Sequence, residues 1–320
     1  MAANVRLAMW AQPAFESMVM SVTVFGSLNL DIALRLPAKA GWGQTLLVDH
    51  SEQAVGGKGL NQAVASARFG SVTRMAGAVG DDAAATLLLD ALRAEGVDVS
   101  AVEAIDGVGS GRATILIEPG GDNMIAVEPA ANLYARAAKA LGAIDGDTRV
   151  LLAQLECDID EIAALFAHDA AAPLCKIVNF APAVPQGAKL FGLADVLIFN
   201  QSEFADYLQL DREPESLSDL GAAQRLLSRP GQAVVVTLGA IGSAAIWADR
   251  EIFSPAIPAP AVIDTSGAGD CYCGVVAACI DQGIAMDQAL RLANAAASLS
   301  VGRHGAAPSM PMRAEVDALT

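Results

Sequence analysis

Two patterns of hydrophobic residues alternate along the chain. Short runs of β-branched and aliphatic residues are typical of buried strands, and they lie at residues 19–25, 73–79, 150–155, 176–180, 195–199 and 233–238. Stretches with the spacing of amphipathic helices lie between or beside them, at residues 60–69, 81–94, 133–141, 159–168, 216–227 and 286–301. Strands that alternate with helices predict a mostly parallel sheet with helices on both faces. The pattern therefore predicts an α/β fold built as a three-layer sandwich.

Two segments depart from this alternation. Residues 29–56 and 101–129 consist of short β-like pieces divided by glycine and proline, and Gly120-Gly121-Asp122 has the composition of a hairpin turn. We expect these segments to form a small β-sheet lid on one domain that spans residues 19–320. Residues 1–18 are expected to be an N-terminal extension without a clear structural role, and the true start could be Met18 or Met20.

Composition and charge narrow the class of protein. Hydrophobic residues make up 53% of the chain, which is ample for a core, and the formal net charge of −16 argues against binding to nucleic acid or an anionic membrane. The best candidate for a membrane span, residues 231–248, contains polar residues and glycines and favours strand, turn, strand. No signal-peptide pattern is recognised, and the five cysteines lack C-x-x-C spacing. We expect a cytoplasmic protein with buried thiols.

The strongest candidate for chemistry is Asp264-Thr265-Ser266-Gly267-Ala268-Gly269-Asp270, followed by an apolar run that could continue as a helix. Glycines allow a tight turn here, so the amides of residues 267–269 would face an anion at a helix N-terminus. A carboxylate beside such a site repels the anion, so its presence there suggests that it has another task. Asp270 could accept the proton of a hydroxyl that attacks a phosphoryl group, or it could only complement the helix dipole.

Other polar residues follow predicted strands or open predicted helices. Asn29 and Asp31 share one face of a strand and suit sugar hydroxyls, although a turn with an Asx cap fits equally well. Lys58 and Asn61 lie one turn apart after Gly56-Gly57, but Gly59 replaces the Ser or Thr that a Walker loop requires.

The carboxyl ends of parallel strands collect ligands, which draws attention to residues after those strands. Asn200 and Glu203 would form a helix capping box or orient a hydrated metal on phosphates. The turn with Gly239 and Gly242 lacks the third glycine and the helix of a dinucleotide fingerprint, which disfavours a dehydrogenase.

Taken in order, these segments resemble the ribokinase-like (phosphofructokinase B type) sugar kinases from residue 19 to the C-terminus. The two family signatures are Gly-Gly-Lys-Gly-x-Asn-Gln-Ala at 56–63 and Asp-Thr-x-Gly-Ala-Gly-Asp at 264–270, and residues 26–31 and 302–309 are most similar to the ribokinase subgroup. The chain departs from the family at Phe180, at Cys271-Tyr272-Cys273 and before Asn132. We expect these departures to bear on substrate selectivity.

The resemblance implies ATP-dependent phosphorylation of a primary sugar hydroxyl, with O5 of ribose as the expected acceptor and Asp270 as the base. It implies sugar contacts from Asn29, Asp31, Gly57, Lys58, Asn61 and Glu156, and an anion hole at Gly267, Ala268 and Gly269. It implies an ATP site lined by Asn200, Thr237, Gly239, Gly242 and Asn294, with Mg²⁺ held through water by Glu203. A monovalent cation, K⁺ by expectation, would be held by Asp264, Ser266, Ser300, Arg303, Gly305 and Ser309.

The resemblance also implies a homodimer formed through the lid sheet. Two other functions stay open at this point: a kinase for another sugar or a nucleoside, and a sugar-binding regulator that has lost catalysis.

Overall fold

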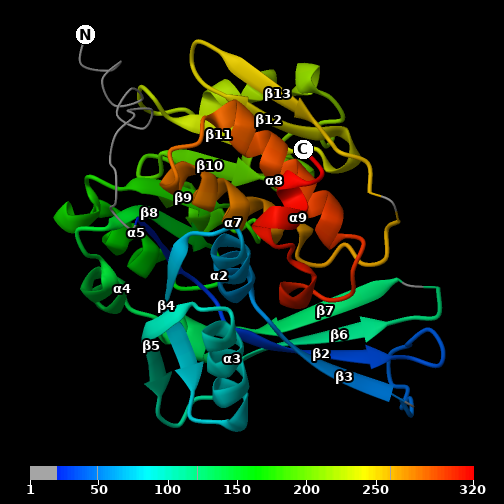
Figure 1. Ribbon diagram of the computed structural model, residues 1–320. Coiled ribbons are helices and arrows are strands. Elements are labelled where there is room, and N and C mark those ends of the chain that lie inside the picture. The colour runs from blue at the N-terminus through cyan, green and yellow to red at the C-terminus, as the bar shows by residue number, and fades with distance from the viewer. Residues whose placement is uncertain (1–19, 49, 121, 260) are drawn as a thin grey trace.

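The computed structural model describes residues 20–48, 50–120, 122–259 and 261–320, and it has the predicted α/β fold with a large sheet and a separate small one (Figure 1). The extension at residues 1–18 lies outside the described residues.

The large sheet runs in the order β13-β12-β11-β10-β9-β8-β1-β4-β5. The strands are β1 (Ser21–Phe25), β4 (Val72–Gly80), β5 (Asp98–Ile105), β8 (Thr148–Gln154), β9 (Cys175–Asn179), β10 (Val196–Phe199), β11 (Ala233–Thr237), β12 (Gly242–Ile246) and β13 (Glu251–Pro255). Neighbours from β5 to β11 pair in parallel, whereas β12 and β13 are antiparallel additions at the edge. The predicted strand, turn, strand at residues 231–248 is therefore confirmed.

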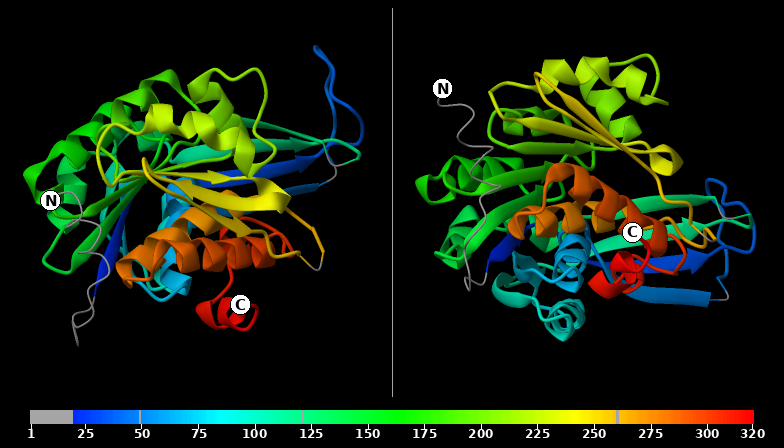
Figure 2. Two further views of the ribbon diagram at one scale, coloured as in Figure 1. Left: turned by 90° about the horizontal axis from the view of Figure 1, so that it is seen from above. Right: turned by 45° about the horizontal axis from the view of Figure 1, so that its top comes forward.

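Side chains of the large sheet alternate between two hydrophobic cores. In β8, Val150 and Leu152 belong to one core and Leu151 and Ala153 to the other. The first core includes residues of α2 (Lys58–Arg68), α3 (Ala83–Ala94), α7 (Ala268–Asp281) and α8 (Met286–Ser300). The second includes residues of α4 (Ala137–Ala143), α5 (Ile159–Ala167), α6 (Gln201–Leu208) and the 3₁₀ segment η4 (Leu217–Leu226). Helices thus cover both faces, as a sheet with two buried faces requires (Figure 2).

Two of the predicted helices take another form. The segment predicted at 216–227 is the 3₁₀ segment η4, and the segment predicted at 133–141 is divided between η1 (Ala130–Tyr134) and α4. The remaining short elements are η2 (Asp169–Ala171), η3 (Pro185–Leu190), η5 (Gly239–Ile241), η6 (Ala307–Ser309) and α9 (Arg313–Asp317). Across the described ranges, no helix has both the length and the apolar character needed to cross a bilayer.

The small sheet projects from the body of the molecule (Figure 1). Its order is β3-β2-β6-β7, with β2 (Asn29–Arg35), β3 (His50–Gly56), β6 (Gly111–Ile117) and β7 (Asn123–Glu128). The expected lid range of 101–129 begins too early, because residues 101–105 belong to β5 and pair with β4 in the large sheet. The β4–α3–β5 crossover places β5 beside β4, where it extends the large sheet.

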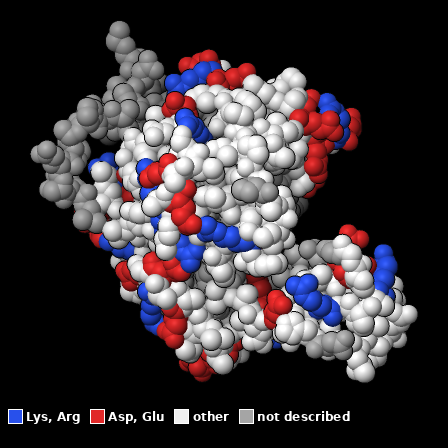
Figure 3. All heavy atoms as spheres, turned by 45° about the vertical axis from the view of Figure 1, so that its right-hand side comes forward, with Lys and Arg blue, Asp and Glu red and all other residues white. Residues whose placement is uncertain are grey.

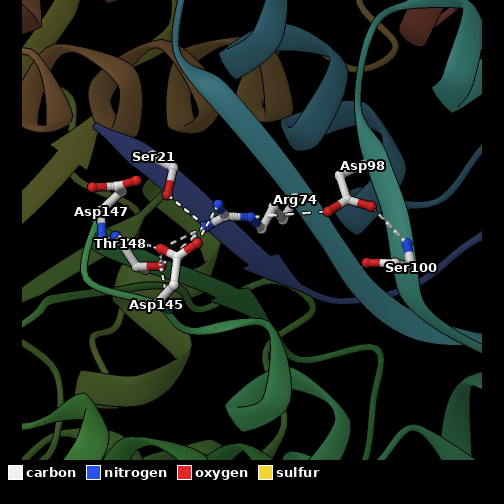
Figure 4. Close-up of polar contacts among 7 residues, drawn as sticks. All are labelled: Ser21, Arg74, Asp98, Ser100, Asp145, Asp147 and Thr148. Carbon is white, nitrogen blue, oxygen red and sulfur yellow. Dashed lines mark hydrogen bonds and ion pairs between the residues drawn. The ribbon is translucent and has the colours of Figure 1, made fainter. Parts of the chain in front are cut away.

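A polar cluster joins four strands at the amino-terminal edge of the large sheet (Figure 4). Arg74 of β4 donates to both carboxylate oxygens of Asp145, at 2.5 and 3.1 Å, and to the hydroxyls of Ser21 and Thr148. Its guanidinium also lies 3.9 Å from Asp98 of β5. This edge is opposite the carboxyl ends of the strands.

Candidate active site

A cavity of about 200 Å³ opens at the carboxyl ends of β9, β10 and β11, beside the first turns of α2, α6 and α7. It is lined by Lys58, Asn179, Ala181, Ile198, Phe199, Asn200, Glu203, Thr237, Gly267, Gly269, Asp270 and Cys273. Seven of the candidate residues singled out from the sequence therefore meet at one place. Figure 3 shows a hollow between the body of the molecule and the projecting small sheet, with acidic and basic side chains interspersed on that face.

Asp270 lies in the first turn of α7, and its side chain lines the cavity while the residue is 8% exposed. Its Oδ2 accepts a hydrogen bond from Nδ2 of Asn61 at 2.9 Å, and its Oδ1 accepts one from Nε2 of Gln62 at 2.9 Å. Both oxygens of the candidate base therefore receive a neutral donor from α2.

The turn before Asp270 depends on Gly267. This residue is the N-cap of α7 with a φ of 74°, which favours glycine, and a Cβ there would lie 2.8 Å from the Cβ of Ala306. The close approach brings the start of α7 against the loop at 302–309. The amides of residues 267–269 thus open a helix of 14 residues, the arrangement that suits an anion.

Helix α2 begins at a second close approach. Gly57 is its N-cap with a φ of 92°, and a Cβ there would lie 2.8 Å from the backbone nitrogen of Asn29. Glu156 accepts hydrogen bonds from the Ser27 hydroxyl at 2.5 Å and from the Lys58 backbone at 3.3 Å. Its carboxylate therefore stabilises the first turn of α2, a structural role that its expected sugar contact did not include.

Asn29 is buried at the start of β2, with 3% exposure. Its Oδ1 accepts a 2.7 Å hydrogen bond from Asn132, whose own Oδ1 accepts from the Leu28 backbone. Sequence reasoning noted Asn132 only as a partial family match, although it orients a candidate sugar contact. Asn61 is also buried, and its Oδ1 has no hydrogen-bond partner within the described part of the chain.

Charges gather between the small sheet and the cavity. Burial, together with the negative charges of Glu156 and Asp270, raises the pKa of Asp31 to about 7. Burial lowers the pKa of Lys58, but the carboxylates of Asp270, Glu156 and Glu203 outweigh it and the pKa rises overall. Lys58 is therefore a half-buried cation held among acidic side chains.

Asn200 and Glu203 form the capping box of α6. Asn200 Oδ1 accepts from the Glu203 backbone at 2.8 Å, and Glu203 Oε2 accepts from the Asn200 backbone at 2.9 Å. Both residues also line the cavity, and burial raises the pKa of Glu203. A carboxylate fixed at the cavity wall fits the orienting of a hydrated Mg²⁺, so the capping role and the metal role are compatible.

The other expected nucleotide contacts are spread more widely. Thr237 lines the cavity, and Gly239 and Gly242 form the turn from β11 to β12, with φ values of 55° and 132°. Asn294 of α8 donates to the backbone oxygens of Ser254 and Pro255 at the end of β13. Asn294 does not line the cavity.

The segments expected to hold a monovalent cation meet beside α7. Asp264 accepts from the backbone nitrogens of Ser266 and Gly305, each at 2.9 Å. Burial raises the pKa of Asp264, but these hydrogen bonds lower it by more, so the pKa falls below its ordinary value.

Most of the polar side chains among the expected cation ligands already have partners within the protein. The hydroxyls of Ser300 and Ser309 donate to backbone oxygens, and the guanidinium of Arg303 pairs with Glu315 at 2.5 Å. A contribution of Arg303 to cation binding would therefore come from its backbone. Within the described ranges, no group of three or more His, Cys, Asp or Glu residues could hold a metal ion.

The departures from the family pattern occupy different environments. Phe180 is fully buried and stacks on Phe199, with ring centroids 4.6 Å apart, so it fills the core and does not face the cavity. Cys271 and Tyr272 are also buried, whereas Cys273 lines the cavity. Of Cys271, Tyr272 and Cys273, only Cys273 is therefore placed to contact a ligand in the cavity. All five cysteines are buried and free, as predicted.

A mostly parallel α/β fold with a carboxylate, a lysine and a glycine turn around one cavity fits a small-molecule kinase. The profile of the pfkB family of carbohydrate kinases matches residues 20–313, so the chain belongs to this family. The predicted class of enzyme, a carbohydrate kinase, is confirmed by this membership.

The chain is similar to curated ribokinases over most of its length. It is 32% identical to the ribokinase of Schizosaccharomyces pombe, with 93% of this chain and 97% of that protein covered. It is 34% identical to the ribokinase of Bacillus subtilis, with 93% and 99% covered. Among solved structures, Arabidopsis thaliana ribokinase complexed with ribose and ATP has a TM-score of 0.86 at 28% identity, with 94% and 99% covered. A nucleoside kinase from Burkholderia thailandensis shares the fold, with a TM-score of 0.77 at 24% identity and with 93% and 95% covered.

Proposed function

We propose that this protein transfers the γ-phosphoryl group of ATP to O5 of ribose and releases ADP and ribose 5-phosphate. The observation that carries the proposal is the position of Asp270, which lines one cavity with Lys58 and the glycine turn and is hydrogen bonded to Asn61. The similarity to ribokinases, one of them solved with ribose and ATP, supports ribose as the acceptor.

In this mechanism the sugar is held with its primary hydroxyl toward Asp270. The residues that hold it are Asn29, Asp31, Gly57, Lys58, Asn61 and Glu156. The hydroxyl oxygen forms a bond to the γ-phosphorus as the bond between that phosphorus and the ADP oxygen breaks. The hydroxyl proton moves to the Asp270 carboxylate. The amides of Gly267, Ala268 and Gly269 stabilise the charge of the transferring group, and positioning supplies much of the rate.

The nucleotide would lie along Asn200, Thr237, Gly239, Gly242 and Asn294. Glu203 would orient Mg²⁺ through water, and the ion when bound neutralises charge on the phosphates. K⁺ would be held mainly through backbone and hydroxyl oxygens. The residues that supply them would be Asp264, Ser266, Ser300, Arg303, Gly305 and Ser309. The loop at 302–309 contacts Gly267, so an ordered cation loop would support the anion hole.

We further propose a cytoplasmic homodimer formed through the small sheet. This sheet exposes Met124, Ile125 and Val127 of β7, and exposed apolar side chains in one strand favour burial against a partner. Light scattering after gel filtration tests the dimer, and a monomeric mass at micromolar concentration would contradict it.

The direct test of the activity is an ADP-release assay across pentoses, hexoses and nucleosides, with and without K⁺. We expect ribose to give the highest kcat/KM and K⁺ to increase it. A higher kcat/KM for another sugar or a nucleoside would replace ribose as the substrate. No ADP release with any acceptor would favour a sugar-binding regulator.

A further inference from the structure

Gln62 occupies the centre of a buried chain of amide side chains beside the cavity. It is fully buried, and its Nε2 donates to Asp270 Oδ1 at 2.9 Å and to Asn179 Oδ1 at 3.1 Å. Its Oε1 accepts from Nε2 of Gln154 at 2.7 Å. Gln62 therefore connects α2 with β8, β9 and α7.

The direction of this chain follows from its chemistry. An ionised carboxylate only accepts hydrogen bonds, so the nitrogen of Gln62 must face Asp270 and its oxygen must face Gln154. Gln154 is itself fully buried, and its Oε1 lies where a side chain on Gly26 would overlap it. The missing side chain at Gly26 thus makes room for the amide that orients Gln62.

Asn61 and Gln62, consecutive residues of α2, each donate to a different oxygen of Asp270. Two donors on two oxygens restrict rotation of the carboxylate about its bond to Cβ. Gln62 does not line the cavity, so any effect on a reaction must pass through Asp270.

The other groups around Asp270 act by charge. Asp31 of β2, Glu203 of α6 and the ammonium of Lys58 lie within its electrostatic reach, and its own charge adds to burial in raising the pKa of the neutral Cys273 thiol. Glu156 adjoins Asp31 and Lys58 in the same group. In this mainly acidic surrounding, a neutral amide stabilises a carboxylate without adding another charge.

We propose that Gln62 is a positioning residue for phosphoryl transfer, which orients the Asp270 carboxylate toward the acceptor hydroxyl and is itself oriented by Gln154. The inference rests on the proposed function, because it assigns Gln62 a task only if Asp270 is the base.

The test compares the full-length wild type with Gln62→Met, with kcat and KM measured from pH 5 to 9. We expect kcat to fall about 10–100-fold because the base is misoriented, with the KM values for sugar and ATP within about threefold. We also expect the acidic limb of the kcat profile to move up by about one pH unit, because a hydrogen bond donated to a carboxylate favours its ionised form. Gln154→Met should also lower kcat and move the acidic limb up, but by less than Gln62→Met does.

The matched control is Gln232→Met. Gln232 is 1% exposed and its amide donates to the backbone of Phe191 and Ala194, at the amino end of β11 and thus away from the cavity. It should lower Tm without moving the acidic limb. A Gln62→Met enzyme with kcat within twofold of wild type, or with a loss of kcat but no shift of the limb, would overturn the inference.

Two further variants complete the design. If Gln62→Met does not fold, Gln62→Glu keeps the shape of the side chain and places a second carboxylate against Asp270, so the limb should move up by more than one unit; an unmoved limb would overturn the inference. Asp270→Asn separates the two proposals. If Asp270→Asn is inactive and the acidic limb of Gln62→Met does not move, only the role of Gln62 is contradicted. If Asp270→Asn is active, the role of Asp270 as the base and the role of Gln62 are both contradicted.

Discussion

Asn61 and Asp270, 209 positions apart in the chain, are joined by a hydrogen bond of 2.9 Å from the amide of one to the carboxylate of the other. The bond ties the first turn of α2, which carries expected sugar contacts, to the first turn of α7, which carries the expected anion hole. The two family signatures therefore form one site.

Asp270→Asn tests the base directly. The substitution keeps the shape of the side chain but removes its ability to accept a proton, so kcat should fall by about 10²–10⁴-fold with little change in ATP affinity. The measurements are steady-state ADP release and calorimetric titration with ATP. Asp281→Asn, at the other end of the same helix, is the matched control and should keep kcat. Near-normal turnover of Asp270→Asn would refute the assignment.

The pKa of Asp31, raised to about 7, predicts how sugar use depends on pH. If sugar hydroxyls donate to the ionised form, kcat/KM for the sugar should fall as the pH decreases below about 7. Asp31→Asn should lower kcat/KM and remove this dependence, which a pH series of initial rates would detect. A wild-type profile that is flat from pH 5.5 to 8 would contradict the prediction.

The same raised pKa has a consequence for stability. The folded protein holds the Asp31 proton more tightly than the unfolded chain, so the stabilising contribution is complete below pH 4 and is lost as the pH rises through 7. Asp31→Asn should therefore raise the Tm of the ligand-free protein more at pH 8 than at pH 5. Thermal scans at the two pH values check this, and an equal shift at both would remove the linkage.

Arg74 should contribute to stability and not to activity. Arg74→Met removes the bidentate hydrogen bonds to Asp145 and should lower the free energy of unfolding by about 1–3 kcal/mol, with KM unchanged. Arg93→Met is the control, because Arg93 pairs with Asp90 at an exposed i, i+3 position and should cost at most about 0.5 kcal/mol. Urea titration distinguishes the two, and equal losses would show that the strand-edge cluster adds nothing.

Asp264 should control the response to K⁺. Asp264→Asn replaces one acceptor oxygen, so one of the bonds from Ser266 and Gly305 is lost and the two loops separate. The K⁺ concentration for half-maximal activation should rise about tenfold or more, which is about 1.4 kcal/mol of binding free energy. Rates are measured against K⁺ at constant ionic strength, with the exposed Asp249→Asn as control. An unchanged half-activation concentration would end this role of Asp264.

Periodicity was informative where burial dominates. Six strands of the large sheet, β1, β4, β8, β9, β10 and β11, were predicted well because they are largely buried on both faces and therefore read as short apolar runs. It was less informative at β5, because the residues of a strand do not specify which sheet it joins. That choice depends on the crossover through α3 and on pairing with β4, and it places residues 101–105 outside the lid.

The residues of the site also differ in how far the sequence reveals them. Gly267, Gly57 and Asp270 could be proposed from sequence, because glycine turns before helices and a carboxylate beside them form a local pattern. The roles of Gln62 and Asn132 could not be proposed, because their partners are far along the chain: Gln154 and Asp270 lie 92 and 208 positions from Gln62, and Asn29 lies 103 positions from Asn132. An amide in a helix looks the same in sequence whether it faces solvent or a catalytic carboxylate.

The sequence by itself determined the order of strands and helices, the two signatures and the class of chemistry, since these depend on local spacing and residue type. Only the tertiary structure decided that α2 and α7 meet at their first turns, that Glu156 stabilises the start of α2, and that two neutral amides donate to Asp270. The physical reason is that hydrogen bonds between distant segments form only after the sheet has brought those segments together.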